Sequence, residues 1–158
     1  MDCRNVRFCD RKADVDFTQL VALFARSAFW ASERSAEDIK IAVENSDPVI
    51  TAWDGDRTIG FARATSDGIF RATIWDVVIH SDYQGLGLGR KLVETLLGHP
   101  KMNRVERVYL MTTNQRKFYE RIGFVKNTTT TMLLEQSPLE IDVAALADER
   151  ALSAAVDC

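Results

Sequence analysis

The chain has 158 residues, 46% of them hydrophobic and 27% charged, a balance typical of one globular domain rather than a disordered or fibrous protein. The net charge is -3 and the isoelectric point about 5.4, which argues against a nucleic-acid partner, because such a partner needs clustered lysine and arginine. The three cysteines lack zinc-like spacing, so we expect no metal. No apolar run approaches about 18 residues, so we expect no membrane partner.

Apolar spacing predicts the elements of the first half of the chain. Apolar residues at helical spacing between Phe17 and Phe24 predict an amphipathic helix, and Ser35 is expected to cap a second helix that begins after it. The turn residues Asp54 and Gly55 predict a hairpin. The expected strands span residues 5–8, 49–53, 58–64 and 70–79.

The most informative segment is the loop of residues 84–90, Gln-Gly-Leu-Gly-Leu-Gly-Arg, which lies between an apolar strand and a helical pattern. Glycines let the backbone turn with its N–H groups pointing inward, and the helix adds the positive end of its dipole, so a pyrophosphate can be held there. The spacing fits neither a Walker A loop nor a Rossmann fingerprint. It fits Q-x-x-G-x-G, with Gln84, Gly87 and Gly89 in register.

A second motif follows after a predicted helix that ends at His99-Pro100 and a predicted strand over residues 107–111. Residues 114–124 predict a short helix with Asn114 at its N-cap and Gly123 past its end. Closing strands are expected over residues 124–127 and 130–134. In their order and spacing, the two motifs resemble the signatures of the GNAT superfamily of acyl-CoA-dependent N-acetyltransferases, over roughly residues 6–134.

The resemblance implies an α+β fold with a mixed, mostly antiparallel central sheet flanked by helices, and with splayed central strands. It also implies direct transfer of an acetyl group from acetyl-CoA to a primary amine in a ternary complex. The loop would bind the pyrophosphate, the backbone of one strand would pair with pantetheine, and Asn114 would contact the pantetheine arm or act only as a helix cap. The implied cofactor-binding residues are Val77, Val78, Ile79, Gln84, Gly85, Leu86, Gly87, Leu88, Gly89, Arg90, Asn114 and Phe118.

Two residues are candidates for proton transfer. An attacking amine is mostly protonated at neutral pH and needs a base, and Asp76 lies in an apolar strand, where an acid is costly unless paired. The alternative is that Asp76 holds a core arginine or caps a gap in the backbone. The resemblance places Tyr119 near the thioester sulfur, where its hydroxyl could protonate the departing thiolate; the alternative is a packed tyrosine. His80 is expected at a surface strand end and His99 at a helix end, outside the chemistry.

The acceptor amine is open between two classes. The strings at residues 75–78, 83–85 and 118–124 are similar to the plastid and cyanobacterial branch of the family, which includes serotonin or arylalkylamine N-acetyltransferases and enzymes that acetylate protein lysines and N-termini. Phe29 and Trp30 lie between the first two helices, where family members form the wall of the acceptor site, and we assign Trp75 to the same site. A non-catalytic acyl-CoA-binding regulator is the remaining alternative.

We expect residues 1–137 to form the acetyltransferase domain and residues 138–158 a C-terminal tail, which apolar spacing makes either a docked helix or a frayed one. A monomer or a homodimer is expected. Residues 1–4 lack the apolar core of a signal peptide, so the expected location is the cytoplasm of a bacterium or cyanobacterium, or the plastid stroma for a processed organellar form.

Overall fold

The computed structural model describes residues 5–128 and 130–134. The chain divides into two compact units, residues 1–125 and 126–158, and the helices and strands given below all lie in the first unit. The predicted domain boundary after residue 137 and the predicted C-terminal tail fall outside the described residues. None of the helices in the described part is long and apolar enough to cross a membrane.

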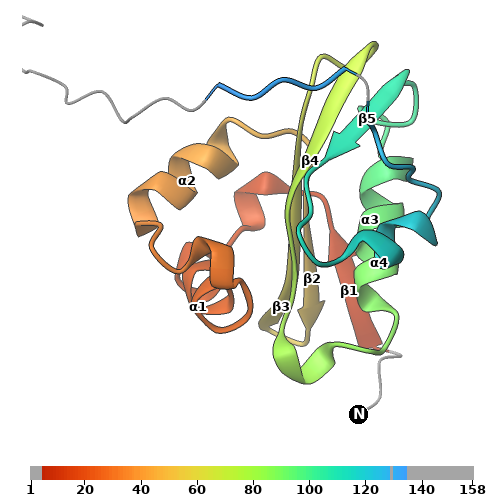
Figure 1. The fold of residues 1–158 in the computed structure, drawn as a ribbon. Coiled ribbons are helices and arrows are strands. Elements are labelled where there is room, and N and C mark those ends of the chain that lie inside the picture. The colour runs from red at the N-terminus through yellow and green to blue at the C-terminus, as the bar shows by residue number, and fades with distance from the viewer. Residues whose placement is uncertain (1–4, 129, 135–158) are drawn as a thin grey trace, which may run out of the picture. The chain divides into compact units, whose positions relative to one another are not determined.

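Five strands form one sheet in the order β1-β2-β3-β4-β5, which confirms the predicted mixed, mostly antiparallel arrangement (Figure 1). The pairs β1–β2, β2–β3 and β3–β4 are antiparallel, whereas β5 runs parallel to β4. The predicted hairpin joins β2 to β3, and Gly55 has the positive φ of 57° that the tight turn requires. The strands are β1 (Val6–Cys9), β2 (Val49–Asp54), β3 (Arg57–Ser66), β4 (Arg71–Ile79) and β5 (Arg107–Leu110).

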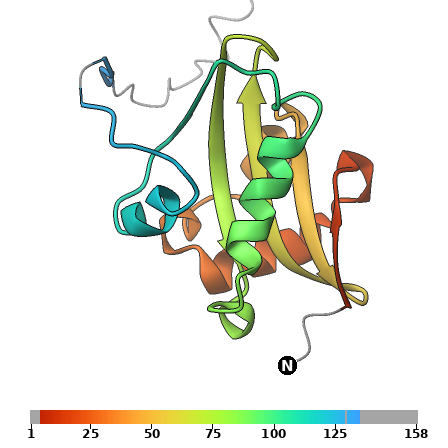
Figure 2. The same cartoon turned by 90° about the vertical axis from the view of Figure 1, so that its right-hand side faces the viewer.

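Helices cover both faces of the sheet: α1 and α2 lie on one face and α3 on the other (Figures 1 and 2). Side chains cap the first two helices, because Asp16 and Ser35 each accept a hydrogen bond from a backbone N–H of the first turn. The cap at Ser35 was predicted. The helices are α1 (Phe17–Ser27), α2 (Ala36–Glu44), α3 (Leu88–Gly98) and α4 (Arg116–Glu120), with the 3-10 helices η2 (Lys12–Asp14), η3 (Phe29–Ala31) and η4 (Ser81–Tyr83).

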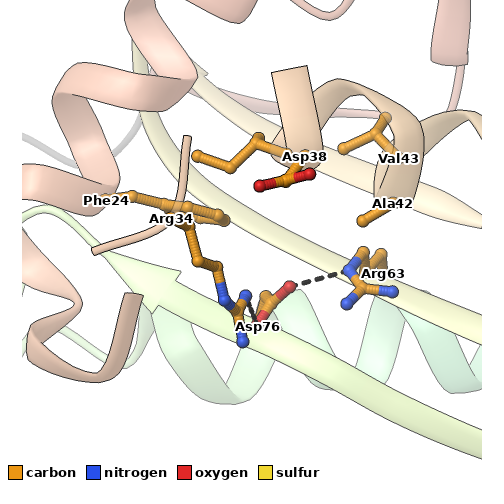
Figure 3. Close-up of a pocket in the computed structure, with 8 residues that line it drawn as sticks. Phe24, Arg34, Asp38, Ala42, Val43, Arg63 and Asp76 are labelled. Atoms are coloured by element: carbon orange, nitrogen blue, oxygen red, sulfur yellow. Dashed lines mark hydrogen bonds and ion pairs between the residues drawn. The ribbon is translucent and has the colours of Figure 1, made fainter. Parts of the chain in front are cut away.

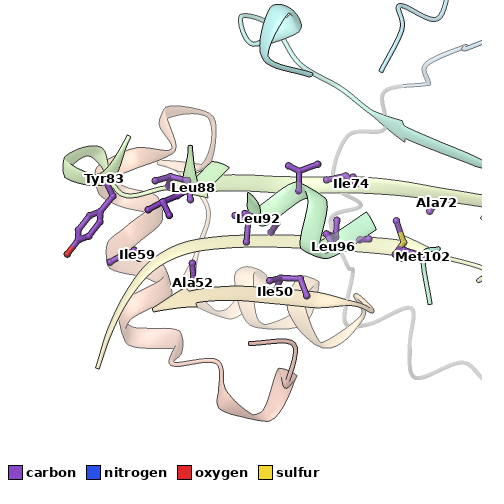
Figure 4. Close-up of a cluster of buried hydrophobic side chains, with 14 residues drawn as sticks. Ile50, Ala52, Ile59, Ala72, Ile74, Tyr83, Leu88, Leu92, Leu96 and Met102 are labelled. Carbon is purple, nitrogen blue, oxygen red and sulfur yellow. The ribbon is translucent and has the colours of Figure 1, made fainter. Parts of the chain in front are cut away.

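Two clusters of buried apolar side chains hold these layers together. Between the sheet and α3, Ile59, Leu92 and Leu96 are fully buried (Figure 4). On the other face, the ring of Phe24 on α1 packs edge-on against Phe61 of β3, with their centroids 5.6 Å apart. Burial of each such side chain contributes about 1.5–3 kcal/mol to the free energy of unfolding, so the packed layers stabilise the sheet.

The predicted closing strands are wrong, because the described residues among 124–127 and 130–134 form no strand. Instead, the Asn127 side-chain amide donates hydrogen bonds to the hydroxyls of Thr130 and Thr131, at 3.3 and 3.0 Å. Asparagine and threonine side chains that bond locally offer an alternative to ladder pairing. Thr130 and Thr131 therefore take part in local side-chain hydrogen bonds in place of a strand ladder.

The sheet opens between β4 and β5. Their parallel pairing runs from Arg71 and Arg107 to Ile74 and Leu110 and stops there, although β4 continues to Ile79. The edge of β4 that faces β5 therefore has no strand partner beyond Ile74 within the described chain. This is the predicted splay of the central strands, and it leaves backbone N–H and C=O groups available to a ligand.

Candidate active site

The glycine loop lies between β4 and α3 and has the geometry of an anion cradle. Gly85 and Gly87 both have φ of 78°, and a Cβ built on either of them meets nothing within 4 Å, so both face open space. Gly87 is the N-cap of α3, and the first helical hydrogen bond runs from the N–H of Lys91 to the carbonyl of Gly87, at 3.2 Å. The N–H groups of residues 88–90 have no hydrogen-bond acceptor among the described residues. An anion at this helix end would meet these free N–H groups.

Side chains fix the cradle to the sheet. The Gln84 amide donates a hydrogen bond to the carbonyl of Ile79 at 3.0 Å and so fastens the loop to the end of β4. A Cβ at Gly89 would make ordinary van der Waals contacts, 3.4 Å from the ring of Phe118 and 3.7 Å from Ile79. The positive φ of Gly87 and the bond of Gln84 to β4 thus give structural reasons for two positions of the predicted register.

A cavity of about 640 Å³ opens beside this loop, a size typical of small-molecule sites. It brings together most of the predicted site residues from β4, the glycine loop, α4 and the segment between α1 and α2. The predicted residues in its lining are Phe29, Trp30, Val77, Val78, Ile79, Gln84, Gly85, Gly87, Gly89, Arg90, Phe118 and Tyr119. The lining residues that sequence reasoning missed are Ser27, Tyr83, Gln115, Arg121 and Ile122.

Five predicted residues do not line this cavity. Leu86 is exposed, and Leu88 is buried in the core beneath α3. Asn114 is exposed and is not the helix cap that we predicted, because α4 begins one residue later with Gln115 as its N-cap. Trp75 and Asp76 lie on the α1 and α2 face of β4, away from the glycine loop.

Tyr119 stands in the cavity with its hydroxyl free. Its ring packs edge-on between Phe118, at 4.9 Å, and Phe124, at 5.9 Å. Within the described residues the hydroxyl makes no hydrogen bond, although the ring is partly buried. Burial raises the pKa of Tyr119 above its ordinary value, because the charged phenolate is the form that loses hydration. The phenol is therefore neutral at physiological pH and can donate a proton or a hydrogen bond.

An aromatic wall formed by Phe29 and Trp30 borders the same cavity. The two rings meet edge to face, with centroids 5.2 Å apart and an interplanar angle of 88°. Phe29 is 74% exposed and Trp30 47% exposed. Large apolar rings in water at the mouth of a cavity are available to cover an apolar ligand.

The charged groups in the cavity lining are both guanidiniums. Arg90, in the first turn of α3, pairs with Glu94 one helical turn away, at 2.6 Å. Arg121 follows α4 and has no ion-pair partner among the described residues. No aspartate or glutamate of the described chain lines the cavity. Arg121 lies within the predicted second motif, but its charge gave no signal of a role.

Asp76 lies on the opposite face of β4 in a cluster of charges (Figure 3). Its carboxylate accepts a hydrogen bond from Arg34 Nη1 at 2.9 Å and another from Arg63 Nε at 2.7 Å, and its side chain is only 6% exposed. These groups line a separate cavity of about 220 Å³ below α2. The contact with a buried arginine is the structural alternative that the sequence left open for this residue.

A bulge in β4 explains this position. Asp76 is the one non-glycine residue of the described chain with a positive φ, 52°, and the register of β3 and β4 shifts there. Trp75 and Asp76, although consecutive, both contact Arg63: the guanidinium lies 5.7 Å from the Trp75 ring centroid and bonds to Asp76. A bulge can turn two neighbouring side chains to one face, whereas regular pleating alternates them.

His80 is buried, which corrects its predicted position at the surface. It is 4% exposed, its Nε2 lies 2.8 Å from Arg57 Nη2, and its Nδ1 accepts from the N–H of Asp82 at 3.2 Å. Burial, followed by the charge of Arg57, lowers the pKa of His80 below its ordinary value. The ring is therefore neutral and holds the start of the glycine loop in place.

The low pKa of His80 predicts a loss of stability in acid. Below about pH 6.5 the unfolded chain protonates this histidine and the folded chain does not, so the free energy of unfolding falls by up to about 1.4 kcal/mol per pH unit. The loss continues until the pH reaches the lowered folded-state pKa. Urea unfolding of wild type and His80→Gln at pH 7.5, 6.5 and 5.5 measures it, with His99→Gln as the control. An equal pH dependence in all three proteins would contradict the prediction.

The residues that the structure describes include no group of three or more histidine, cysteine, aspartate or glutamate side chains placed to hold a metal ion.

The fold matches that of solved structures. A GNAT-family protein from Xanthomonas campestris pv. campestris has a structure that matches with a TM-score of 0.74 at 22% identity, over 84% of this chain and 93% of that one. The architecture is thus the GNAT fold. The sequence profile of the acetyltransferase (GNAT) family matches residues 17–124, which is more than half of the chain. The chain belongs to the GNAT family.

Curated relatives give the same family. An uncharacterized N-acetyltransferase, ycf52, from Pyropia yezoensis is 39% identical over 106 residues, which are 64% of this chain and 60% of the relative. Serotonin N-acetyltransferase 2, chloroplastic, from Oryza sativa subsp. japonica is 35% identical over 115 residues, which are 70% of this chain and 56% of the relative. The matched region thus spans 60% or less of the length of these two relatives.

Proposed function

We propose that this protein transfers an acetyl group from acetyl-CoA directly to a primary amine in a ternary complex. One observation carries the proposal: a single cavity is lined by the glycine loop, the open stretch of β4 and the hydroxyl-bearing Tyr119. The free N–H groups at the start of α3 suit a pyrophosphate, and the unpaired edge of β4 suits the amides of a pantetheine arm. The donor therefore fits along one continuous surface.

The proposed reaction forms a bond between the amine nitrogen and the carbonyl carbon and breaks the bond between carbon and sulfur. Tyr119 gives its hydroxyl proton to the departing thiolate, and the phenolate recovers the proton that the amine loses. With ordinary pKa values near 10 for a tyrosine hydroxyl and 8.5 for a thiol, this proton transfer is uphill by about 2 kcal/mol. Burial raises the pKa of Tyr119, but the same apolar surroundings make the thiolate more basic. The general-base role of Asp76 stays a prediction.

We propose an arylalkylamine, such as tryptamine or serotonin, as the acceptor. The aromatic wall is exposed beside Tyr119 and can stack on or cover an aromatic ring, which adds apolar burial that an alkylamine lacks. The name of the rice relative, a serotonin N-acetyltransferase, agrees with this choice. Trp75, which we had assigned to the acceptor, bonds through Nε1 to Thr65 Oγ1 at 2.9 Å outside the cavity, so the acceptor proposal rests on Phe29 and Trp30.

Trp30→Ala should change the choice of acceptor. We expect kcat/KM for tryptamine to fall by about tenfold, because a half-exposed ring contributes roughly 1.5 kcal/mol of apolar and stacking contact. The value for a lysine peptide should change little. The measurement is kcat/KM for both acceptors in wild type and variant, with Ile41→Ala, an exposed apolar truncation on α2, as the control. An unchanged ratio, or a wild-type preference for the peptide, would contradict the aromatic acceptor.

An assay of CoA release tests the activity itself. Wild-type protein is incubated with acetyl-CoA and a panel of aromatic amines, polyamines and lysine or N-terminal peptides. Release that depends on one class of amine supports the transferase and identifies the acceptor. Tight acetyl-CoA binding without amine-dependent release would favour the non-catalytic regulator. The location in cytoplasm or plastid stroma and the monomeric or dimeric state stay predictions.

A further inference from the structure

The aromatic wall is carried by a segment that is fastened to the sheet at both ends. Residues 28–35 connect α1 to α2 and include η3 with Phe29 and Trp30. At the first end, Ser27 Oγ accepts from the N–H of Ser81 at 3.2 Å, and Arg26 Nε donates to Ser81 Oγ at 3.1 Å. At the second end, Arg34 Nη1 bonds to Asp76 Oδ1 at 2.9 Å. Both anchors lie on β4 or just past it.

The second anchor joins an exposed arginine to a buried carboxylate. Asp76 is 6% exposed, and its other oxygen accepts from Arg63 Nε, whose side chain is 12% exposed and also donates through Nη1 to Ser46 Oγ at 3.0 Å. The Arg34 side chain is 40% exposed and, among the described residues, its one ion pair is the bond to Asp76. Figure 3 shows Arg34 reaching down to the carboxylate from the α2 side. The end of the segment that leads into α2 thus has this contact as its ionic link to the sheet.

Within the segment, local hydrogen bonds offer little alternative support. The N–H of Ala31 donates to the carbonyl of Ala28 at 2.9 Å, and the N–H of Arg34 donates to the carbonyl of Ala31 at 3.1 Å. Ser32 Oγ donates to the carbonyl of Phe29 at 3.0 Å. These bonds shape single turns but do not hold the segment on the sheet. Phe29 and Trp30 themselves are too exposed to anchor it by burial, whereas the small side chains of Ala28 and Ala31 are buried in the core and hold the start of the segment. The end of the segment, at residues 32–35, has no buried side chain.

We propose that Asp76 is a positioning residue that, through Arg34, holds the aromatic wall at the cavity. Acceptor binding then depends on Asp76, and proton abstraction does not. Each carboxylate oxygen accepts from a guanidinium, and Asp76 lines the cavity below α2 rather than the cavity that Tyr119 lines, so the carboxylate is placed to hold Arg34 and not to meet the amine. The inference about acceptor binding rests on the proposed transferase function, whereas the anchoring of the segment can be measured without it.

The kinetic test compares Arg34→Met with Lys40→Met, which removes a cation of similar exposure on α2. We expect Arg34→Met to raise KM for tryptamine by about tenfold, the scale of one charged hydrogen bond. The KM for acetyl-CoA, the kcat and its pH profile should stay near wild type, and Arg34→Lys should recover part of the loss. Lys40→Met should behave as wild type.

Asp76→Asn keeps a residue that tolerates the positive φ of the bulge and removes the charge. It should raise the same KM, and the double variant with Arg34→Met should be no worse than the more damaged single variant, because the contact between Arg34 and Asp76 is lost in both single variants. A loss of kcat in Asp76→Asn alone, with recovery at high pH where free amine accumulates, would overturn the proposal in favour of a general base.

Hydrogen exchange gives a readout that needs no activity. The amides of Ala31 and Arg34, which are bonded within the segment, should exchange about tenfold faster in Arg34→Met and in Asp76→Asn than in wild type. The exchange rates of amides in α3 should not change in these variants, and Lys40→Met should leave the exchange rates of the segment as in wild type. Unchanged exchange of the segment in Arg34→Met would overturn the anchoring role. A wild-type protein without turnover, but with these exchange rates, would refute the transferase and keep the anchor.

Discussion

Replacing Gly87 with valine is expected to weaken acetyl-CoA binding by about 100-fold or more, equivalent to about 2.7 kcal/mol, while the fold survives. Gly87 is the N-cap of α3, its φ is 78°, and the space beside its Cα is open to the cavity. A branched side chain there would occupy the volume in which a pyrophosphate meets the free N–H groups. Titration calorimetry with acetyl-CoA measures the loss.

The chain offers a closely matched control for the strain of this change. Gly68, in the turn between β3 and β4, has φ of 81° and equally open surroundings. Valine at either position should cost roughly 1–2 kcal/mol of stability through its left-handed backbone, but only the Gly87 variant should lose the ligand. Wild type should gain about 2.7 kcal/mol of stability at 100 times the dissociation constant. A wild-type melting temperature that does not rise at saturating acetyl-CoA would refute acetyl-CoA binding at the glycine loop.

Tyr119→Phe should lower kcat by about 100-fold and leave acetyl-CoA affinity nearly unchanged. The change removes one hydroxyl that has no hydrogen-bond partner in the described protein and keeps the ring between Phe118 and Phe124. Stability should therefore stay close to wild type. Steady-state kinetics at saturating acetyl-CoA, together with a melting curve, separate loss of chemistry from loss of folding.

The pH dependence sharpens this test. Because burial raises the pKa of Tyr119, the phenol stays protonated through neutral pH, and any alkaline loss of kcat that it causes should lie above about pH 10. This loss of kcat at alkaline pH should be absent from Tyr119→Phe. Tyr109→Phe, on β5 and outside the cavity, is the control. Equal, small effects of both substitutions on kcat would mean that Tyr119 only packs.

Local patterns were enough to predict the glycine loop and the short helix that carries Tyr119, whereas the place of Tyr119 near the thioester was implied by the family resemblance and stays a prediction. The glycine loop is defined by backbone φ and by the start of a helix, both of which depend on neighbouring residues. The order of strand, loop and helix then brings the second motif to the same cavity. The hairpin and the cap at Ser35 were predictable for the same reason.

Contacts between distant segments were beyond the sequence pattern. Asp76 meets Arg34 and Arg63, which are 42 and 13 residues away, and nothing local indicates either pairing. The bulge also breaks the alternation that would send Trp75 and Asp76 to opposite faces. The predicted closing strands are wrong because local strand propensity is a weak guide where no neighbouring strand imposes pairing.

The charge of the cavity lining sets an order of events in the proposed reaction. Arg90 is paired with Glu94, so in the proposed reaction the local positive potential of the empty lining would come mainly from Arg121 and the free N–H groups of α3, and it would favour a polyanion over a protonated amine. Once the phosphates of acetyl-CoA are bound, that potential is neutralised or reversed, and the amine can approach. The donor would thus enter first and the deacylated, still anionic product would leave last, so the positive groups that favour capture also slow turnover.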